Sequence, residues 1–393
     1  MNNCESNLLI KVKMPRLEGK QLKVDLKMCS SVAASLTFTS RSAMSYSSLA
    51  ERKSSFKKGI DASEGRRSRN ETSINLRKAK KDEGLLKRRM LSPTPAAMES
   101  TSQPVDAKKV YTVADIPALS AALAQPNIDG PTLLEVARGF RKILSVENNP
   151  PVKAVLDCGV LPALVQMLTC IDKPEVQFEA AWALTNIAST DFTKVVVDAG
   201  AVPNLVMLLS SPNAESRDQA AWCLGNIAGD CSALRDGALA AGALGPLIQN
   251  IMAPATPSLL NNSVWALSNF CRGKPAPELA LISSAIPVLA SILSNNSGDA
   301  KVDALWALSY ISDGQDERIQ AVVNSGIAPI LIDLLSSDES SIITPALRTV
   351  GNIVSGNDEQ TQAILDAGLI AKMPVLLQSS KVRLWCCVSF LHL

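Results

Sequence analysis

Tryptophan and asparagine recur together along this chain in a pattern that could do chemistry. Tryptophan returns at intervals of 40, 43 and 41 residues, and one further interval of 42 ends at an arginine (Trp182, Trp222, Trp265, Trp306, Arg348). Four residues after each of these positions stands an asparagine or, once, a tyrosine (Asn186, Asn226, Asn269, Tyr310, Asn352). Three residues before each tryptophan stands another polar residue (Glu179, Gln219, Asn262, Asp303). We call these three rows together the ladder.

Side chains of these types could hold an extended basic peptide. In a helix, positions i−3, i and i+4 fall within one stripe of about 60°. Indole rings attract Lys and Arg through cation–π contacts and cover their methylene stems, and acidic neighbours can take the charged heads. An Asn amide offers both a donor and an acceptor to a peptide backbone. Because packed helices lie about 8–10 Å apart and an extended chain advances about 3.3 Å per residue, one repeat spans about three ligand residues.

A row of tryptophans buried in a protein core is the alternative explanation for the indole rings. It does not account for the asparagines, because a buried amide needs a hydrogen-bond partner in every repeat. We therefore expect the ladder to face solvent, and the residues between its members, such as Ala183, Leu184 and Ile187, to face the core.

A repeat of about 42 residues must position the ladder. Segments such as DAGAVPNLVMLL (198–209) recur between the tryptophan motifs, so each unit should hold two shorter helices and a longer third helix that carries the ladder. Glycines should end the first helices, and prolines suit the first turn of the second (Gly159, Gly200, Gly242, Gly326, Gly368; Pro162, Pro203, Pro246, Pro287, Pro329). Ser284 replaces this glycine in one unit. Polar breaks ending at Asn213 and at Asp338 should supply N-caps for third helices.

The composition of the 393 residues suits closely packed helices. Apolar residues make up 47% of the chain but aromatic residues only 4%, so the core must rely on Ala, Leu, Ile and Val. One such unit cannot bury its apolar faces alone, whereas neighbours stacked in a row can. The sequence therefore predicts an all-α solenoid over residues 110–381, with about six units and part of a seventh. A compact helical protein with accidental internal similarity is the alternative.

Nothing in the sequence favours catalysis. The single histidine is His392, and acid–base or nucleophilic mechanisms usually need a histidine inside a folded site. No phosphate-binding loop, nucleophile elbow or HExxH motif occurs, and the nine cysteines show no CxxC pair or metal-ligand spacing, which is typical of proteins in a reducing compartment. We expect no catalytic residue, no cofactor and no metal. No stretch reaches the roughly 20 apolar residues of a membrane span, so we expect no membrane contact.

The ladder and its repeat together resemble the importin-α family, whose fold is a right-handed armadillo-repeat solenoid. The resemblance runs from about Val110 to about Lys381, and the recurring Trp…Asn pair distinguishes it from catenin-type armadillo proteins. It implies a major site for basic nuclear localisation signals (Trp182, Asn186, Thr193, Gln219, Trp222, Asn226, Asp230, Asn262, Trp265, Asn269, Asp303, Trp306). Thr193 and Asp230 match the positions that hold the key lysine of the signal. The loop STDFTK (189–194) departs from the family pattern, since it is two residues shorter and lacks a glycine.

The same resemblance implies a second, minor site that begins at Tyr310, Arg348 and Asn352. After Lys381 the tail VRLWCCVSFLHL (382–393) departs from the family pattern. We therefore expect an incomplete minor site and impaired binding of the export receptor. At the other end, residues 1–50 read as a disordered extension. Its Ser-rich stretch at 30–48 faintly resembles a transit peptide, and Met44 is a plausible alternative start.

A basic arm precedes an acidic body. Residues 1–100 hold 21 Lys/Arg and 10 Asp/Glu, whereas the rest holds 18 and 27, so the net charge of +2 hides a strong asymmetry. Within residues 51–90, FKKGID, RRSRN and NLRKAKKDEGLLKRRM resemble the importin-β-binding domain, and the implied contacts are basic (Lys57, Lys58, Arg66, Arg67, Arg69, Arg77, Lys78, Lys80, Lys81). By composition alone the arm would be a solvated disordered tail or would bind nucleic acid nonspecifically. The lack of aromatic residues beyond Phe56 disfavours base stacking.

The arm also carries a sequence that looks like a localisation signal, Lys87-Arg88-Arg89. The linker at 91–109 has a flexible reach of about 25 Å, which matches two or three repeats, so we expect the arm to compete with cargo. The resemblance implies a shuttling import adaptor of cytoplasm and nucleus. Its partners would be importin-β and cargo proteins, with the export receptor and nucleoporins as further candidates and no direct nucleic-acid contact. An armadillo scaffold for signalling or adhesion is the alternative.

Overall fold

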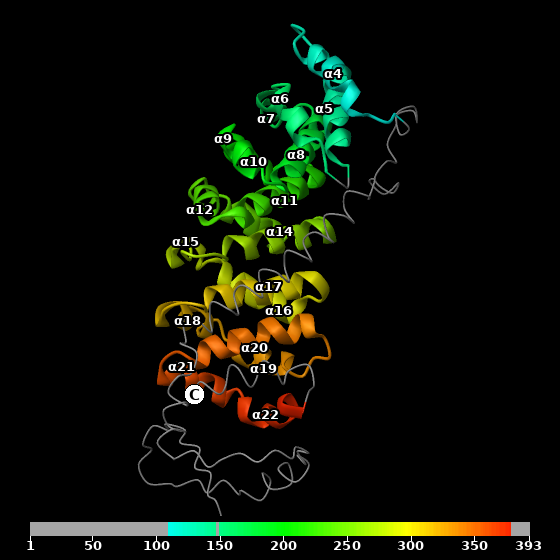
Figure 1. Cartoon of the computed structure of the whole chain (residues 1–393). Coiled ribbons are helices and arrows are strands. Elements are labelled where there is room, and N and C mark those ends of the chain that lie inside the picture. Colours follow the sequence, from blue (N-terminus) through cyan, green and yellow to red (C-terminus); the bar gives the residue numbers. More distant parts are fainter. Residues whose placement is uncertain (1–108, 147–148, 379–393) are drawn as a thin grey trace, which may run out of the picture. The chain divides into compact units, whose positions relative to one another are not determined.

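The computed structural model describes residues 109–146 and 149–378, which belong to one compact unit of the chain. Within these ranges every regular element is a helix, and Figure 1 shows the helices stacked one after another in a row. The all-α repeat architecture predicted from the sequence is confirmed. The predictions for residues 1–50, 51–90, most of the linker 91–109 and the tail 382–393 lie outside the described residues.

Five units of three helices each occupy the middle of the described part. Their first helices are short: α6 (Val152–Asp157), α9 (Thr193–Asp198), α12 (Ser232–Ala240), α15 (Leu279–Ile282) and α18 (Asp316–Val323). Their second helices are α7 (Leu161–Met167), α10 (Ala201–Leu208), α13 (Leu244–Met252), α16 (Ala285–Asn295) and α19 (Ala328–Leu334). Their third helices are the longest: α8 (Pro174–Ala188), α11 (Ala214–Asp230), α14 (Pro257–Phe270), α17 (Gly298–Ile311) and α20 (Ser340–Val354). Before them come η2 (Val113–Asp115), α4 (Ile116–Leu123) and α5 (Gly130–Leu144), and after them α21 (Asp358–Asp366) and α22 (Leu369–Gln378).

The predicted helix boundaries rest on the expected residues. The five glycines that follow first helices have φ between 73° and 97°, which is the left-handed conformation that ends a helix. Where Ser284 stands instead, φ is −64°, and the chain passes from α15 into α16 without a left-handed residue. The five prolines lie in the first turns of the second helices, as predicted.

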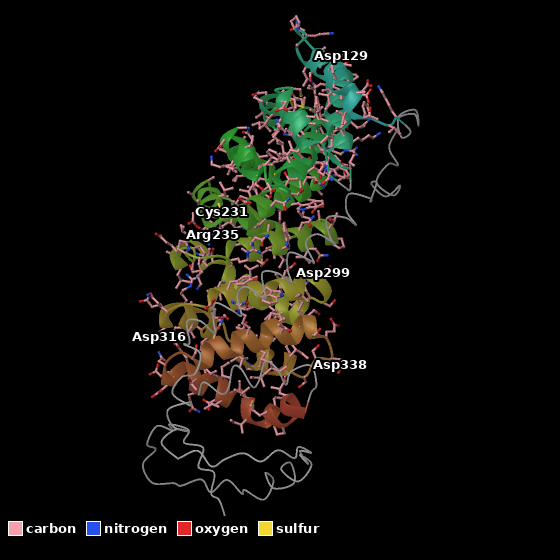
Figure 2. The ribbon with its side chains drawn as sticks, viewed as in Figure 1. Asp129, Cys231, Arg235, Asp299, Asp316 and Asp338 are labelled. Carbon is pink, nitrogen blue, oxygen red and sulfur yellow. The ribbon has the colours of Figure 1, made fainter. Side chains whose placement is uncertain are left out.

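The third helices begin at capping side chains in several units. Asn213 accepts a hydrogen bond from the backbone N of Ser216 at 2.8 Å, which confirms the predicted cap of α11. Asp129, labelled in Figure 2, caps α5 in the same way by accepting from Thr132 at 2.7 Å. The prediction that the polar break 336–338 supplies the N-cap of α20 is wrong, because the N-cap is Glu339. The Ser337 hydroxyl accepts from the backbone N of Glu339 at 3.1 Å, and the helix begins only after Glu339.

The third helices pack side by side and form the centre of each unit. Successive pairs from α5 to α20 are in contact along the row. Their facing positions are small and fully buried, for example Ala180, Ala183 and Ala220. The closest approach involves Gly225 of α11, because an ideal Cβ built there would lie 2.3 Å from Cζ3 of the Trp265 ring. The indole of one repeat therefore occupies the space that a side chain would take on the preceding repeat.

Substituting Gly225 by alanine should destabilise the array although alanine is the better helix former. Overpacking of this kind lowers the free energy of unfolding by about 1–3 kcal/mol. The higher helix propensity of alanine raises it by only roughly 1 kcal/mol. The control is Gly351→Ala in α20, where nothing lies within 4 Å of the added Cβ, so the substitution should be neutral or stabilising. Urea denaturation of both variants measures the difference. A Gly225→Ala protein as stable as Gly351→Ala would contradict the packing described.

Candidate peptide-binding site

The ladder residues occupy equivalent positions on consecutive third helices. Each Trp…Asn pair lies on one helix, from Trp182 and Asn186 on α8 to Trp265 and Asn269 on α14. Trp306 and Tyr310 follow on α17, and Arg348 and Asn352 on α20. Since these helices pack against one another in order, the structure brings the whole ladder together across neighbouring repeats.

Each ladder asparagine donates a hydrogen bond to the preceding repeat. The amide nitrogen of Asn226 lies 3.3 Å from the backbone oxygen of Thr185, and that of Asn269 lies 3.0 Å from the backbone oxygen of Gly225. The same bond recurs from Asn352 to the Ser309 oxygen at 3.0 Å. Asn186 instead donates to the Ser145 hydroxyl at 3.1 Å. The row of amides therefore joins adjacent third helices at a constant register.

The expectation that the ladder faces open solvent is wrong for most ladder residues, which are buried. Trp182, Trp222 and Trp306 are only 5–7% exposed, and Trp265 is half-buried. The ladder asparagines of α8, α11 and α14 are at most 3% exposed. A buried amide needs a hydrogen-bond partner in every repeat. The carbonyl of the preceding helix supplies one in each repeat, because the helices approach closely enough for the amide to reach across.

Some polar atoms of the ladder nevertheless remain without a partner in the described part. The side-chain oxygens of Gln219 and Asn226, both on α11, are buried and accept no hydrogen bond, and the indole nitrogen of Trp182 on α8 donates none. Buried polar groups are nearly always paired. Five side-chain atoms of the described part outside the ladder also lack a partner, so this feature does not distinguish the ladder.

Asp230 is the last residue of α11, and its side chain is exposed. A carboxylate at a helix C-terminus is electrostatically disfavoured, since the helix dipole places partial negative charge there. Arg272 offsets part of this charge by donating to the Gly229 oxygen at 2.6 Å. A Cβ on Gly229 would lie 3.3 Å from the amide nitrogen of Asn269, so the end of α11 lies next to the ladder of the following repeat.

Thr193 lies at the start of α9 and is 2% exposed. Its hydroxyl lies 2.9 Å from the Ala188 oxygen and 2.8 Å from the Thr190 oxygen. The hydroxyl therefore donates its proton to backbone oxygens at the end of α8 and in the short loop that follows it. Its role toward a ligand lysine stays a prediction.

The flanking polar row differs from unit to unit. Asn262 donates to Asp218 at 2.5 Å, and Asp218 also accepts from the Ser258 hydroxyl at 2.8 Å. The sequence argument missed Asp218 because it lies one residue before the ladder position Gln219. Asp303 is half-buried. Gln219 and Asn262 are 7% and 1% exposed.

At the C-terminal end of the ladder an arginine lies against aromatic rings. Trp306 and Tyr310 stack with centroids 6.0 Å apart and planes at 26°. The Arg348 guanidinium lies 5.5 Å from the Tyr310 centroid and 6.0 Å from that of Trp306, and its Nη2 lies 3.4 Å from Asp313. Asp313 was also missed by the sequence argument, since it lies outside the spacing of the ladder.

A buried thiol lies next to the ladder on α11. Burial raises the pKa of the Cys223 thiol to about 12, so the thiol beside Trp222 is neutral and part of the core. Among residues 109–146 and 149–378, no three His, Cys, Asp or Glu side chains gather where they could hold a metal ion. No helix in those ranges has the length and apolar character needed to cross a membrane.

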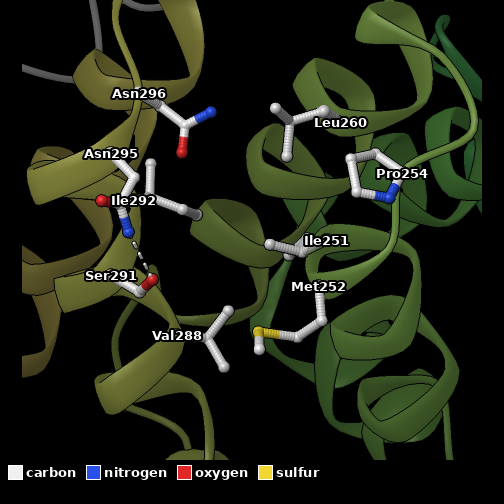
Figure 3. A pocket seen from close by; sticks show the side chains of 9 residues that line it. All are labelled: Ile251, Met252, Pro254, Leu260, Val288, Ser291, Ile292, Asn295 and Asn296. Carbon is white, nitrogen blue, oxygen red and sulfur yellow. Dashed lines mark hydrogen bonds between the residues drawn. The ribbon is translucent and has the colours of Figure 1, made fainter.

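A pocket of about 240 Å³ lies between α13, α14 and α16 (Figure 3). Apolar side chains line most of it, among them Ile251, Met252 and Ile292, and Asn295 donates to Ser291 at 3.2 Å on its wall. It contains no ladder residue and no titratable group.

Comparison with known proteins agrees with this arrangement. The family model described as Armadillo/beta-catenin-like repeat matches residues 148–189, 189–229 and 315–355, and the model for the Importin beta binding domain matches residues 52–129. Importin subunit alpha-2 of Arabidopsis thaliana is 42% identical over 288 residues, which is 70% of this chain and 52% of that protein. The chain belongs to the importin-α family. The predicted armadillo-repeat fold is confirmed with it.

Other members of the importin-α family show similar sequence identity to the chain. Importin subunit alpha-1a of Oryza sativa subsp. japonica is 46% identical over 283 residues, covering 70% of the chain and 52% of the relative. Importin subunit alpha-B of Dictyostelium discoideum is 44% identical over 280 residues, with coverage of 70% and 53%. The chain thus spans about half the length of the curated importin-α relatives it matches.

Among solved structures, a designed armadillo repeat protein in complex with the peptide (KR)4 is similar. It shares 28% identity with this member of the importin-α family, at a TM-score of 0.55, over 58% of this chain and 98% of the designed one. An engineered protein is 32% identical at a TM-score of 0.56, over 61% and 97%.

Proposed function

We propose that this chain is a nuclear-import adaptor that binds basic localisation signals along the ladder and links them to importin-β. The observation that carries the proposal is the row of indole rings and amides on consecutive third helices, two of whose rings already lie against arginines of the chain. An extended peptide presents one N–H and one C=O per residue, which suits a row of amide side chains repeated in each unit. Basic side chains then provide the selectivity.

The indole rings and carboxylates are suited to lysine and arginine. Within the chain itself, Arg141 and Arg348 already lie over ladder rings, at 4.5 Å from the Trp182 centroid and 6.0 Å from the Trp306 centroid. A ligand cation would use the same contact on the rings between them. The designed armadillo protein whose fold this chain shares was solved with an alternating Lys/Arg peptide, (KR)4. Asp230, exposed at the end of α11, is the carboxylate that would receive the key lysine.

The second half of the proposed function concerns the basic arm, which lies outside the described residues. The match of residues 52–129 to the Importin beta binding domain supports importin-β as the partner of this segment. Lys87, Arg88 and Arg89 would compete with cargo for the ladder until importin-β withdraws the arm. Shuttling between cytoplasm and nucleus, and contacts with the export receptor and nucleoporins, belong to the same proposal. No catalysis is proposed.

Titration of a labelled basic peptide against residues 91–393, followed by fluorescence anisotropy, tests the proposal. A monopartite signal should bind, and a peptide with its basic residues replaced by alanine should not. A bipartite signal should gain little over the monopartite one, since the minor site is expected to be incomplete.

Asp230→Asn should lower the affinity for the monopartite peptide by about tenfold or more, because a hydrogen bond to a charged group contributes roughly 1.5–3 kcal/mol. Asp198→Asn is the matched control, since it removes an exposed carboxylate of α9 that pairs with Lys194 away from the ladder. If the two variants bind the peptide with equal affinity, Asp230 does not contact the peptide. Absence of any peptide binding by the unaltered protein would overturn the import proposal.

A further inference from the structure

The ladder extends one repeat further toward the N-terminus than its tryptophans do. Arg138, Arg141 and Ser145 of α5 precede Glu179, Trp182 and Asn186 by 41 residues each, which is the interval of the repeat. Ser145 accepts the hydrogen bond of Asn186, as backbone oxygens accept those of Asn226 and Asn269 in later repeats. Arg141 thus stands where the following repeats have tryptophan.

Arg141 and Arg138 fill the first position of the ladder. The Arg141 guanidinium lies 4.5 Å from the centroid of the Trp182 ring, and its Nε lies 2.6 Å from Oε2 of Glu179. Nε of Arg138 lies 3.1 Å from the other oxygen of Glu179. The carboxylate that a ligand cation would use in this repeat is therefore bound by two guanidinium groups of the chain itself.

The two guanidinium groups of this cluster occupy the Glu179 carboxylate from both sides. Two arginines face one glutamate, and Glu135 of the same helix interacts electrostatically with Arg138 and offsets part of its charge. The side chain of Arg138 is 29% exposed and that of Arg141 is 13% exposed, so both can still be reached from solvent. Glu179 has only 7% side-chain exposure, so losing both arginines without a replacement cation would leave a buried carboxylate unpaired.

We propose that Arg141 and Arg138 are specificity-determining residues that end the basic run of a bound signal and select an acidic residue beside it. This inference rests on the proposed function, since it concerns the ligand of the same ladder. A lysine that reached this end would meet two guanidinium groups, a carboxylate that both of them already occupy, and an indole face already covered by one of them. A carboxylate there would pair with the exposed part of Arg138.

The test uses the full chain and peptides that share one basic core. Lys, Ala or Glu is placed next to the core on either side, which gives six peptides, and the dissociation constant of each is measured by competition. Ratios between peptides are compared, because a competing arm lowers all apparent affinities by the same factor. At one flank, Glu should bind about tenfold tighter than Lys, and added salt should reduce this ratio. The flank that responds reveals the direction of the bound peptide.

Arg141→Gln should bring that ratio close to one or invert it, since Glu179 would then be open to a ligand lysine. Arg141→Lys keeps the charge and should retain most of the preference, which guards against a merely structural effect. Lys153→Gln, which removes an exposed charge paired with Asp157 on α6, should leave the ratio unchanged. If all peptides bind but Arg141→Gln keeps the ratio of the unaltered chain, the inference is wrong while the proposed function stands. If no peptide binds the unaltered chain, the proposed function itself fails.

Discussion

Replacing Trp222 and Asn226 together by alanine is expected to weaken the binding of a basic signal peptide by about 30- to 1,000-fold. Aromatic anchors at the centre of an interface typically contribute about 2–4 kcal/mol, and each factor of ten corresponds to 1.4 kcal/mol. Trp222 lies between Trp182 and Trp265 on the ladder, and Asn226 carries a buried oxygen that accepts no hydrogen bond in the described part. Isothermal titration with a monopartite peptide measures the loss.

The control must separate peptide affinity from stability, because Trp222 is only 6% exposed and its removal leaves a cavity. Leu205→Ala on α10 creates a comparable cavity at a fully buried residue outside the ladder. It should lower the melting temperature yet keep the peptide affinity of the folded protein. Unchanged affinity of the Trp222→Ala, Asn226→Ala protein would favour a general armadillo scaffold over an import adaptor.

Deletion of residues 51–90 is expected to tighten the binding of the same peptide by about 10- to 100-fold. A tethered competitor acts at an effective concentration in the millimolar range, so an arm of moderate intrinsic affinity would occupy the ladder most of the time. Anisotropy titrations of the full chain and of the deletion variant compare the two directly.

Two further samples decide whether the arm acts through its basic triplet. Replacement of Lys87, Arg88 and Arg89 by alanine should reproduce most of the gain, whereas alanines at Arg66, Arg67 and Arg69 should not. The same affinity with and without residues 51–90 would refute autoinhibition. The implied importin-β contact would remain to be measured separately, by binding of importin-β to the arm.

The helical repeat and most of its boundaries could be read from the sequence. Gly200 and Pro203, for example, fix where α9 ends and α10 begins, because left-handed backbone and a missing N–H are local properties of these residue types. The start of α20 could not be read in the same way. Asp338 and Glu339 are both polar, and only the hydrogen bond at the Ser337 hydroxyl selects the later one.

The ladder illustrates the limit of reasoning from spacing alone. Its register was visible, and the interval of 41 residues would have extended it to Arg141 had arginine been counted as a member before Trp182. The solvent exposure of the ladder side chains could not be read from the sequence. Whether the Asn269 amide faces solvent or the preceding helix depends on how closely α14 approaches α11, and Gly225 and the Trp265 ring set that distance.

The sequence by itself determined the three-helix unit, the order of the units and the rows of indole and amide side chains, because periodicity and helix termination arise within one segment of chain. Only the tertiary structure decided which partners those side chains have. The amides join neighbouring repeats, and Glu179 is held by Arg138 and Arg141. These contacts cross between repeats about 40 residues apart, and their distances follow from how the helices pack.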